Sequence, residues 1–201
     1  MQVVGRLLNA ARVLPNRFWL LVGGTFVYLI GVQICWAFVT LYMTGRPPDG
    51  LGLSMSTVGL ILGVPMLVGL PMQILGGAAT DRFGRRPVLI LGICGSIILC
   101  EGLALANTLW QVIAVVSFEA AFGWAMFFTA NNVIVADLTP PRRRAEAFSI
   151  SRTAISSGIV VGPPIGALLY HFDATFRLNF FVAGGVCGLF LLIVLLWFKE
   201  T

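Results

Sequence analysis

Long apolar stretches alternate with short polar connections along the whole chain. Six stretches are each long enough to cross a bilayer, which takes about 20 mostly apolar residues in helical form. We therefore predict six membrane-spanning helices, at about 18–43, 55–79, 87–106, 109–136, 147–170 and 179–198. Because the connections are short, neighbouring helices are expected to be antiparallel. Spans of this length exclude barrel strands, so the predicted fold class is an all-α membrane protein.

The composition supports this fold class and limits the kinds of binding partner that we expect. The chain has 201 residues, of which 58% are hydrophobic and only 10% are charged, and its mean hydropathy is +0.95. Soluble domains carry roughly 25% charged residues, so this chain lacks the polar residues to cover a water-facing surface. The net charge of +5 is compatible with nucleic-acid binding, but the placement of the basic residues favours a role in membrane topology. We expect the lipid bilayer as a partner and no nucleic acid.

Most basic residues gather at one end of the predicted bundle. Of the 13 lysines and arginines, all but Arg46 and Arg177 lie in the lead at 1–17, in the connections at 80–87 and 137–146, at Arg152 or at the C-terminal end. Cytoplasmic loops carry an excess of basic residues, so this asymmetry predicts that both chain termini are cytoplasmic. The lead itself has the composition of a segment at the membrane surface.

A glycine pattern recurs at an offset of 99 residues. Gly59, Gly63 and Pro65 in the second span correspond to Gly158, Gly162 and Pro164 in the fifth. This offset predicts two three-helix repeats, at about 18–106 and 109–198. With three helices each, the second repeat must be inverted relative to the first.

The connection between the second and third spans has a specific set of charges. It reads Gly-Ala-Ala-Thr-Asp-Arg-Phe-Gly-Arg-Arg-Pro from Gly77 to Pro87, and Gly84 stands where a tight turn calls for a positive φ. The fourth span ends at Asp137, at the same depth, and Asp137 is expected to pair with Arg85 or Arg86 through charge-assisted hydrogen bonds. The alternative is that these arginines only anchor the helix ends in the cytoplasm.

The G-x-x-x-D-R-x-G-R-R pattern of this connection resembles the loop between the second and third helices of major facilitator superfamily transporters. The resemblance covers the chain throughout and implies the N-terminal six-helix half of a twelve-helix fold, in which 199–201 begin the central linker. It also implies a second six-helix half, either covalent, on a separate chain or in a homodimer. A cytoplasmic latch that stabilises one access state is implied at Gly77, Asp81, Arg82, Gly84, Arg85, Arg86, Asp137 and Arg144.

The fifth span carries Gly158, Gly162, Pro163 and Gly166. Glycines four apart let another helix approach closely, and the prolines are expected to bend the segment, so we predict a packing face and a hinge. The G-x-x-x-G-P-x-x-G-A pattern is similar to the fifth-helix motif of the superfamily's drug:proton antiporters, which implies export. A sugar or metabolite porter, and a transport-incompetent half that acts as a membrane assembly partner, remain alternatives.

Glu119 is an ionisable residue inside the fourth span, where a charge costs roughly 2.5–3.5 kcal/mol at the helix centre. The family often has R-x-x-x-G here, but this chain has Glu119 before Gly123. We predict that Glu119 binds a proton or a cationic substrate. Phe122 and Met126 follow at helical spacing and are expected to line the same cavity, with Gln33 and Trp36 facing it from the first span. The alternative is a neutral glutamate used for packing.

Other chemistry is not indicated by the sequence. No P-loop, nucleophile–base arrangement or metal-ligand spacing is present, so neither an enzyme, a metal site nor a cofactor is expected, and a proton gradient is the expected energy source. The four cysteines all lie in apolar stretches and are interpreted as core residues. Glu101 is expected to extend toward the membrane interface. The expected location is a bacterial plasma membrane, and the expected substrate is a lipophilic or cationic small molecule.

Overall fold

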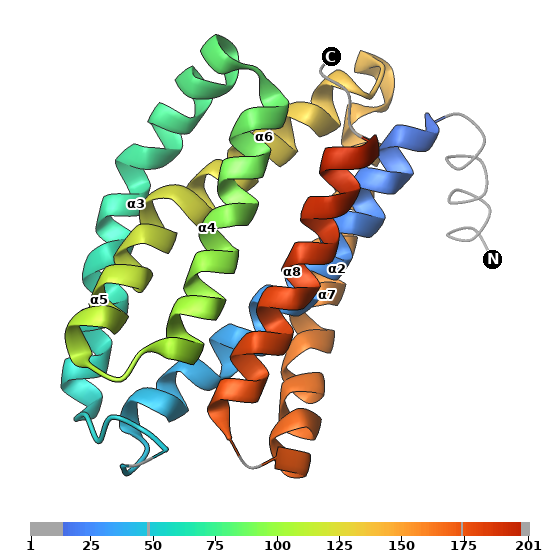
Figure 1. Cartoon of the computed structure of the whole chain (residues 1–201). Coiled ribbons are helices and arrows are strands. Elements are labelled where there is room, and N and C mark those ends of the chain that lie inside the picture. Colours follow the sequence, from blue (N-terminus) through green and yellow to red (C-terminus); the bar gives the residue numbers. More distant parts are fainter. Residues whose placement is uncertain (1–13, 48, 174, 198–201) are drawn as a thin grey trace.

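The computed structural model describes residues 14–47, 49–173 and 175–197 (Figure 1). Among these residues, six helices are long and apolar enough to cross a membrane, which confirms the predicted fold class. They are α2 Asn16–Thr44, α3 Met55–Phe83, α4 Arg85–Leu105, a composite helix over Leu109–Asp137, α7 Arg144–Asp173 and α8 Phe176–Trp197. The composite helix consists of α5 Leu109–Phe118, the π turn η1 Glu119–Gly123 and α6 Trp124–Asp137, and the short η2 Pro141–Arg143 precedes α7. Most of the predicted lead and the expected linker at 199–201 lie outside the described residues.

Several helices extend past the ends that hydropathy predicts. α3 continues to Phe83 and α4 starts at Arg85, so Gly84 alone forms the turn between them. Its φ of 94° is in the region that favours glycine, as predicted. The helices are longer than the apolar stretches because a helix does not have to end at the membrane surface. Its backbone hydrogen bonds can continue among polar residues in water.

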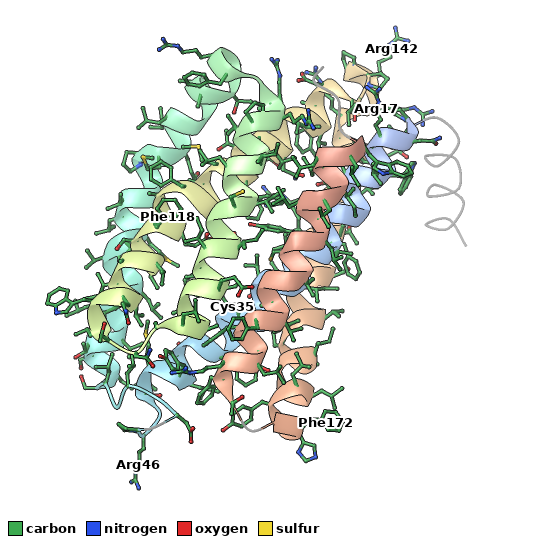
Figure 2. All side chains as sticks on the ribbon, viewed as in Figure 1. Arg17, Cys35, Arg46, Phe118, Arg142 and Phe172 are labelled. Atoms are coloured by element: carbon green, nitrogen blue, oxygen red, sulfur yellow. The ribbon has the colours of Figure 1, made fainter. Side chains whose placement is uncertain are left out.

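The helices form two groups that meet at α4 and α8. Figure 1 shows α3, α4 and the composite helix on one side and α7 and α8 on the other, while α2 crosses from the upper right to the lower left of the view. α2 packs mainly on α7 and α8, which belong to the predicted second repeat, and α3 packs mainly on α6 and η1. The helices of the two predicted repeats therefore interleave. Figure 2 shows Arg17 and Arg142 at one end of the bundle and Arg46 at the other.

The glycines of α7 form its contact with α2. A Cβ atom at Gly158 would lie 2.8 Å from Cβ of Leu29, and one at Gly162 would lie 2.5 Å from Cβ of Gln33. Because carbon atoms cannot approach so closely, these positions have no room for a side chain. α7 stays helical through Pro163 and Pro164. The predicted packing face is thus present, and it holds Gln33 in place; the hinge remains a prediction.

Replacing Gly162 with valine is expected to lower the stability of the bundle by about 1–3 kcal/mol, because the new side chain must push α7 away from α2. Gly188→Val on α8 is the matched control, since a Cβ there meets no atom within 4 Å. Thermal unfolding of both variants in detergent micelles, followed by circular dichroism, measures the difference. Equal effects of the two substitutions would contradict the packing described here.

Candidate functional site

A cavity of about 410 Å³ lies between α2, α3 and the composite helix. Its wall is mostly apolar, and its polar groups are few: the amides of Gln33 and Gln73, the carboxyl of Glu119 and two tryptophan indoles. Such a lining suits a largely apolar small molecule that carries few polar groups. The lining residues are Gln33, Trp36, Leu62, Pro65, Met66, Gly69, Leu70, Gln73, Val116, Glu119, Ala120, Trp124 and Ala125.

The π turn decides which residues of the composite helix face the cavity. The backbone N–H of Trp124 donates to the carbonyl of Glu119, five residues back, so the turn holds one residue more than an α-helical turn. One extra residue rotates the following helix by roughly 100°, the share of one residue in a 3.6-residue turn. The wall therefore continues from Glu119 to Ala120, Trp124 and Ala125.

The structure differs from the prediction for two residues of this wall. Phe122 does not line the cavity and lies against the ring of Phe118, with the ring centroids 5.0 Å apart. Met126 is buried in the core, where its sulfur faces Gly76 of α3. Counting by three and seven residues from Glu119 assumes a regular α-helix, and the π turn breaks that count. Gln33, Trp36 and Glu119 do line one cavity, as the sequence suggested.

The carboxyl of Glu119 lies at the back of the cavity and is only 1% exposed. Its two oxygens accept hydrogen bonds from the Ser96 hydroxyl of α4, at 3.0 Å and 3.2 Å. The Tyr28 hydroxyl of α2 lies 2.5 Å from the same Ser96 oxygen. Within the described part of the chain, Glu119 forms no ion pair. A buried carboxyl thus depends on hydroxyl groups rather than on an arginine or a lysine.

Glycines create the space in which this carboxyl lies. A Cβ atom at Gly123 would overlap the Glu119 carboxyl group. A Cβ atom at Gly95 of α4 would lie 2.6 Å from Cα of Gly123, so α4 approaches the π turn at the distance of backbone contact. The retained glycine of the E-x-x-x-G pattern therefore has a packing reason: it lets the glutamate fold against its own helix.

Sequence reasoning missed four residues of the site that carry polar groups. Gln73 and Trp124 line the cavity, and Ser96 and Tyr28 form the hydrogen-bonded chain behind Glu119. A glutamine inside an apolar span is a signal that could have identified Gln73. Ser96 and Tyr28 have no such signal, because small hydroxyl residues are ordinary in membrane helices.

Glu101 packs beside α8, and its expected extension toward the membrane interface remains a prediction. Its side chain lies against Gly184 of α8, where a Cβ atom would overlap its carboxyl group, and it is half-buried. The absence of a side chain at Gly184 leaves room for this contact, which the sequence pattern does not reveal.

The charged turn around Gly84 brings together only some of the residues predicted for the cytoplasmic latch. Arg85 Nε lies 2.9 Å from Asp137 Oδ2, in an ion pair whose two side chains are each 33% exposed. Arg86 Nη2 donates to the carbonyl of Leu195 of α8 at 2.7 Å. The turn therefore links α4 to α6 and α8.

The remaining residues predicted for the latch do not take part in these contacts. Asp81, Arg82 and Arg144 are exposed, and none of them has a hydrogen-bond or ion-pair partner among the described residues. Arg82 lies over the ring of Phe83, at 5.4 Å from its centroid. Gly77 is half-buried beside open space, so packing does not require a glycine there.

Comparison with known proteins identifies relatives over most of the chain. A family model described as Major Facilitator Superfamily matches residues 21–201. An uncharacterized MFS-type transporter of Bacillus subtilis, YqjV, is 28% identical over 182 residues, covering 90% of this chain and 43% of that protein. The multidrug resistance protein MdtH of Yersinia enterocolitica is 29% identical over 170 residues, covering 85% of this chain and 41% of that protein. The chain thus spans about two fifths of the length of these curated relatives.

Solved structures share the fold. A POT family transporter in complex with a thioalcohol-conjugated peptide superposes with a TM-score of 0.82 at 24% identity, covering 92% of this chain and 39% of that one. A POT family transporter in complex with 5-aminolevulinic acid gives a TM-score of 0.81 at 25% identity, covering 91% and 38%. These proteins are transporters rather than enzymes.

A double-mutant cycle of Arg85→Ala and Asp137→Ala is expected to give a coupling energy of about 0.5 kcal/mol, the range of partly exposed ion pairs. Urea unfolding in mixed micelles measures it. The cycle of Arg85→Ala with Asp81→Ala is the control and is expected to show no coupling, since Asp81 does not contact Arg85. A stronger coupling to Asp81 than to Asp137 would refute this arrangement of the turn.

Proposed function

Because the chain belongs to the major facilitator superfamily, we propose that it forms the first half of a secondary active transporter for proton-coupled efflux. The proposed substrates are lipophilic or cationic small molecules, moved by alternating access. The proton gradient is the proposed energy source, so that protons entering the cell drive export. The observation that carries this proposal is a single buried carboxyl, Glu119, in the wall of a mostly apolar cavity.

The chemistry of this cavity favours a proton or a cation at Glu119. A carboxylate in an apolar site gains stability from a bound positive charge, and it can become neutral by taking up a proton instead. The proton and the cation bind to the same carboxyl group, so they compete for it. Competition between proton and substrate for one carboxyl couples their binding, and alternating access to the two sides of the membrane turns this coupling into exchange transport.

Two features support export over import. The helix-5 pattern around Gly162 and Pro163 is similar to that of the superfamily's drug exporters, and one curated relative is named a multidrug resistance protein. At 29% identity, the name of that relative supports the class of substrate and does not identify the compound.

The proposed partner is a second six-helix half, whether covalent, on a separate chain or in a homodimer. One side of α7 exposes Arg152, Thr153, Ser156 and Ser157, around a hollow of about 510 Å³. Polar side chains within a spanning helix are costly in lipid and face water or protein instead. The side of α7 that carries them is therefore proposed to border the transport path between the two halves.

The basic end of the bundle is proposed to face the cytoplasm of a bacterial cell, across its plasma membrane. In this orientation, the turn around Gly84 and the ion pair of Arg85 with Asp137 belong to the cytoplasmic latch. Asp81, Arg82 and Arg144 lie exposed at the same end and are proposed to engage the second half, which supports a latch completed between the halves.

Glu119→Gln is expected to reduce proton-driven efflux at least tenfold while membrane insertion stays normal, because glutamine has the size of glutamate but cannot exchange a proton. The measurement uses inverted membrane vesicles that contain the complete transporter, an imposed proton gradient and a fluorescent lipophilic cation. Reconstitution of the 201-residue chain alone provides the comparison that shows whether a second half is needed.

Glu101→Gln is the matched control, because Glu101 lies against α8 outside the cavity; it is expected to keep most of the activity. Full proton-dependent efflux by Glu119→Gln would refute the proposed coupling role. Transport of a sugar but of no lipophilic cation by the unmodified transporter would favour a metabolite porter instead.

A further inference from the structure

A chain of three hydrogen-bonding groups runs behind the cavity, from Tyr28 of α2 through Ser96 of α4 to Glu119. All three side chains are nearly or fully inaccessible to solvent: Tyr28 and Ser96 are 0% exposed and Glu119 is 1% exposed. The ring of Tyr28 is held against Phe127, with ring centroids 4.0 Å apart. Its hydroxyl group therefore has a defined position.

When Glu119 is ionised, the number of hydroxyl protons determines which group donates in each of these hydrogen bonds. A carboxylate can only accept hydrogen bonds, so Ser96 must donate its one hydroxyl proton to it. The Ser96 oxygen then has lone pairs but no second proton, so the Tyr28 hydroxyl must be the donor in their contact. Both protons point toward the carboxylate, and each bond strengthens the other.

Protonation of Glu119 weakens this arrangement. A protonated carboxyl keeps an oxygen that can accept from Ser96, but its own O–H becomes a buried donor that needs an acceptor. The hydrogen bond from Ser96 also loses the strength that a charged acceptor gives. The hydroxyl chain therefore favours the ionised form of Glu119 over the protonated form.

Other titratable groups near Glu119 do not supply a positive charge. They are the phenol of Tyr28 and the thiol of Cys35 on α2, the thiol of Cys100 on α4 and the thiol of Cys187 on α8. All of these groups are neutral or negative. The hydroxyl chain is thus the interaction in the described structure that favours a negative charge at Glu119.

We propose that Ser96 and Tyr28 are positioning residues for proton binding, which hold the ionised form of Glu119 at the back of the cavity. This inference rests on the proposed role of Glu119 as a proton-binding group. The hydroxyl chain keeps the midpoint of Glu119 protonation lower than burial alone would set it. Removing the Ser96 hydroxyl must therefore move that midpoint to higher pH.

Infrared spectroscopy of the purified 201-residue chain in lipid vesicles tests this without any transport. The carbonyl band of protonated carboxyl groups is followed during a pH titration, and the band lost in Glu119→Gln is assigned to Glu119. Ser96→Ala is expected to raise the midpoint of that band by about one to two pH units, the worth of a hydrogen bond to a charged group. Tyr28→Phe is expected to shift it in the same direction by less.

Two further variants separate positioning from general packing. Ser96→Thr keeps the hydroxyl group and is expected to leave the midpoint unchanged. Ser151→Ala removes a buried serine of α7 that does not contact Glu119, and it is expected to have no effect. Tyr28→Phe retains the aromatic packing, so it still tests the chain if Ser96→Ala fails to fold.

An unchanged or lowered midpoint in both Ser96→Ala and Tyr28→Phe would overturn the inference, as would a Glu119 band that does not titrate. These results are independent of the efflux assay. A transporter whose Glu119→Gln variant still exports its substrate would contradict the proposed function, but the infrared shift would still establish the role of the two hydroxyl groups.

Discussion

The hydrogen bonds from Ser96 to Glu119 are the interaction on which the rest of the site depends. A carboxyl group inside an apolar helix bundle loses its hydration, and a charge there costs roughly 2.5–3.5 kcal/mol at the helix centre. Such a residue is tolerated where other groups satisfy it. Here Ser96 of α4 donates to the carboxyl, and Tyr28 of α2 hydrogen-bonds to Ser96, while Glu119 also lines the cavity.

Close backbone approach makes these hydrogen bonds possible. A serine side chain is short, so α4 must come within backbone distance of the composite helix for Ser96 to reach Glu119. Glycines at 92, 95 and 123 permit this: Cβ atoms at Gly92 and Gly95 would lie 2.5 Å from Phe127 N and 2.6 Å from Gly123 Cα. The glycines of α7 do the same for α2 and hold Gln33 at the cavity. The site therefore depends on the glycines that allow close helix contacts as much as on the residues that line the cavity.

Sequence reasoning was sufficient where a feature depends on local chemistry. The six spans follow from hydropathy, the positive φ of Gly84 from the shortness of a turn, and the pair of Arg85 with Asp137 from equal depth on neighbouring helix ends. It was insufficient where the backbone departs from a regular helix. Because of the π turn, Ala120 and Trp124 line the cavity instead of the predicted Phe122 and Met126. No sequence pattern marks such a turn. Ser96 and Tyr28 depend on contacts between residues 68 positions apart, which spacing within one helix does not reveal.

The central claim is that one carboxyl, Glu119, binds either a proton or a cationic substrate. The most direct test counts the protons released when a lipophilic cation such as tetraphenylphosphonium binds to the purified transporter in weakly buffered detergent solution, with a pH-indicator dye as the readout. At a pH where Glu119 is protonated, linkage predicts about one proton released per cation bound, and none in Glu119→Gln. Cation binding without proton release, or equal release in the variant, would contradict the account.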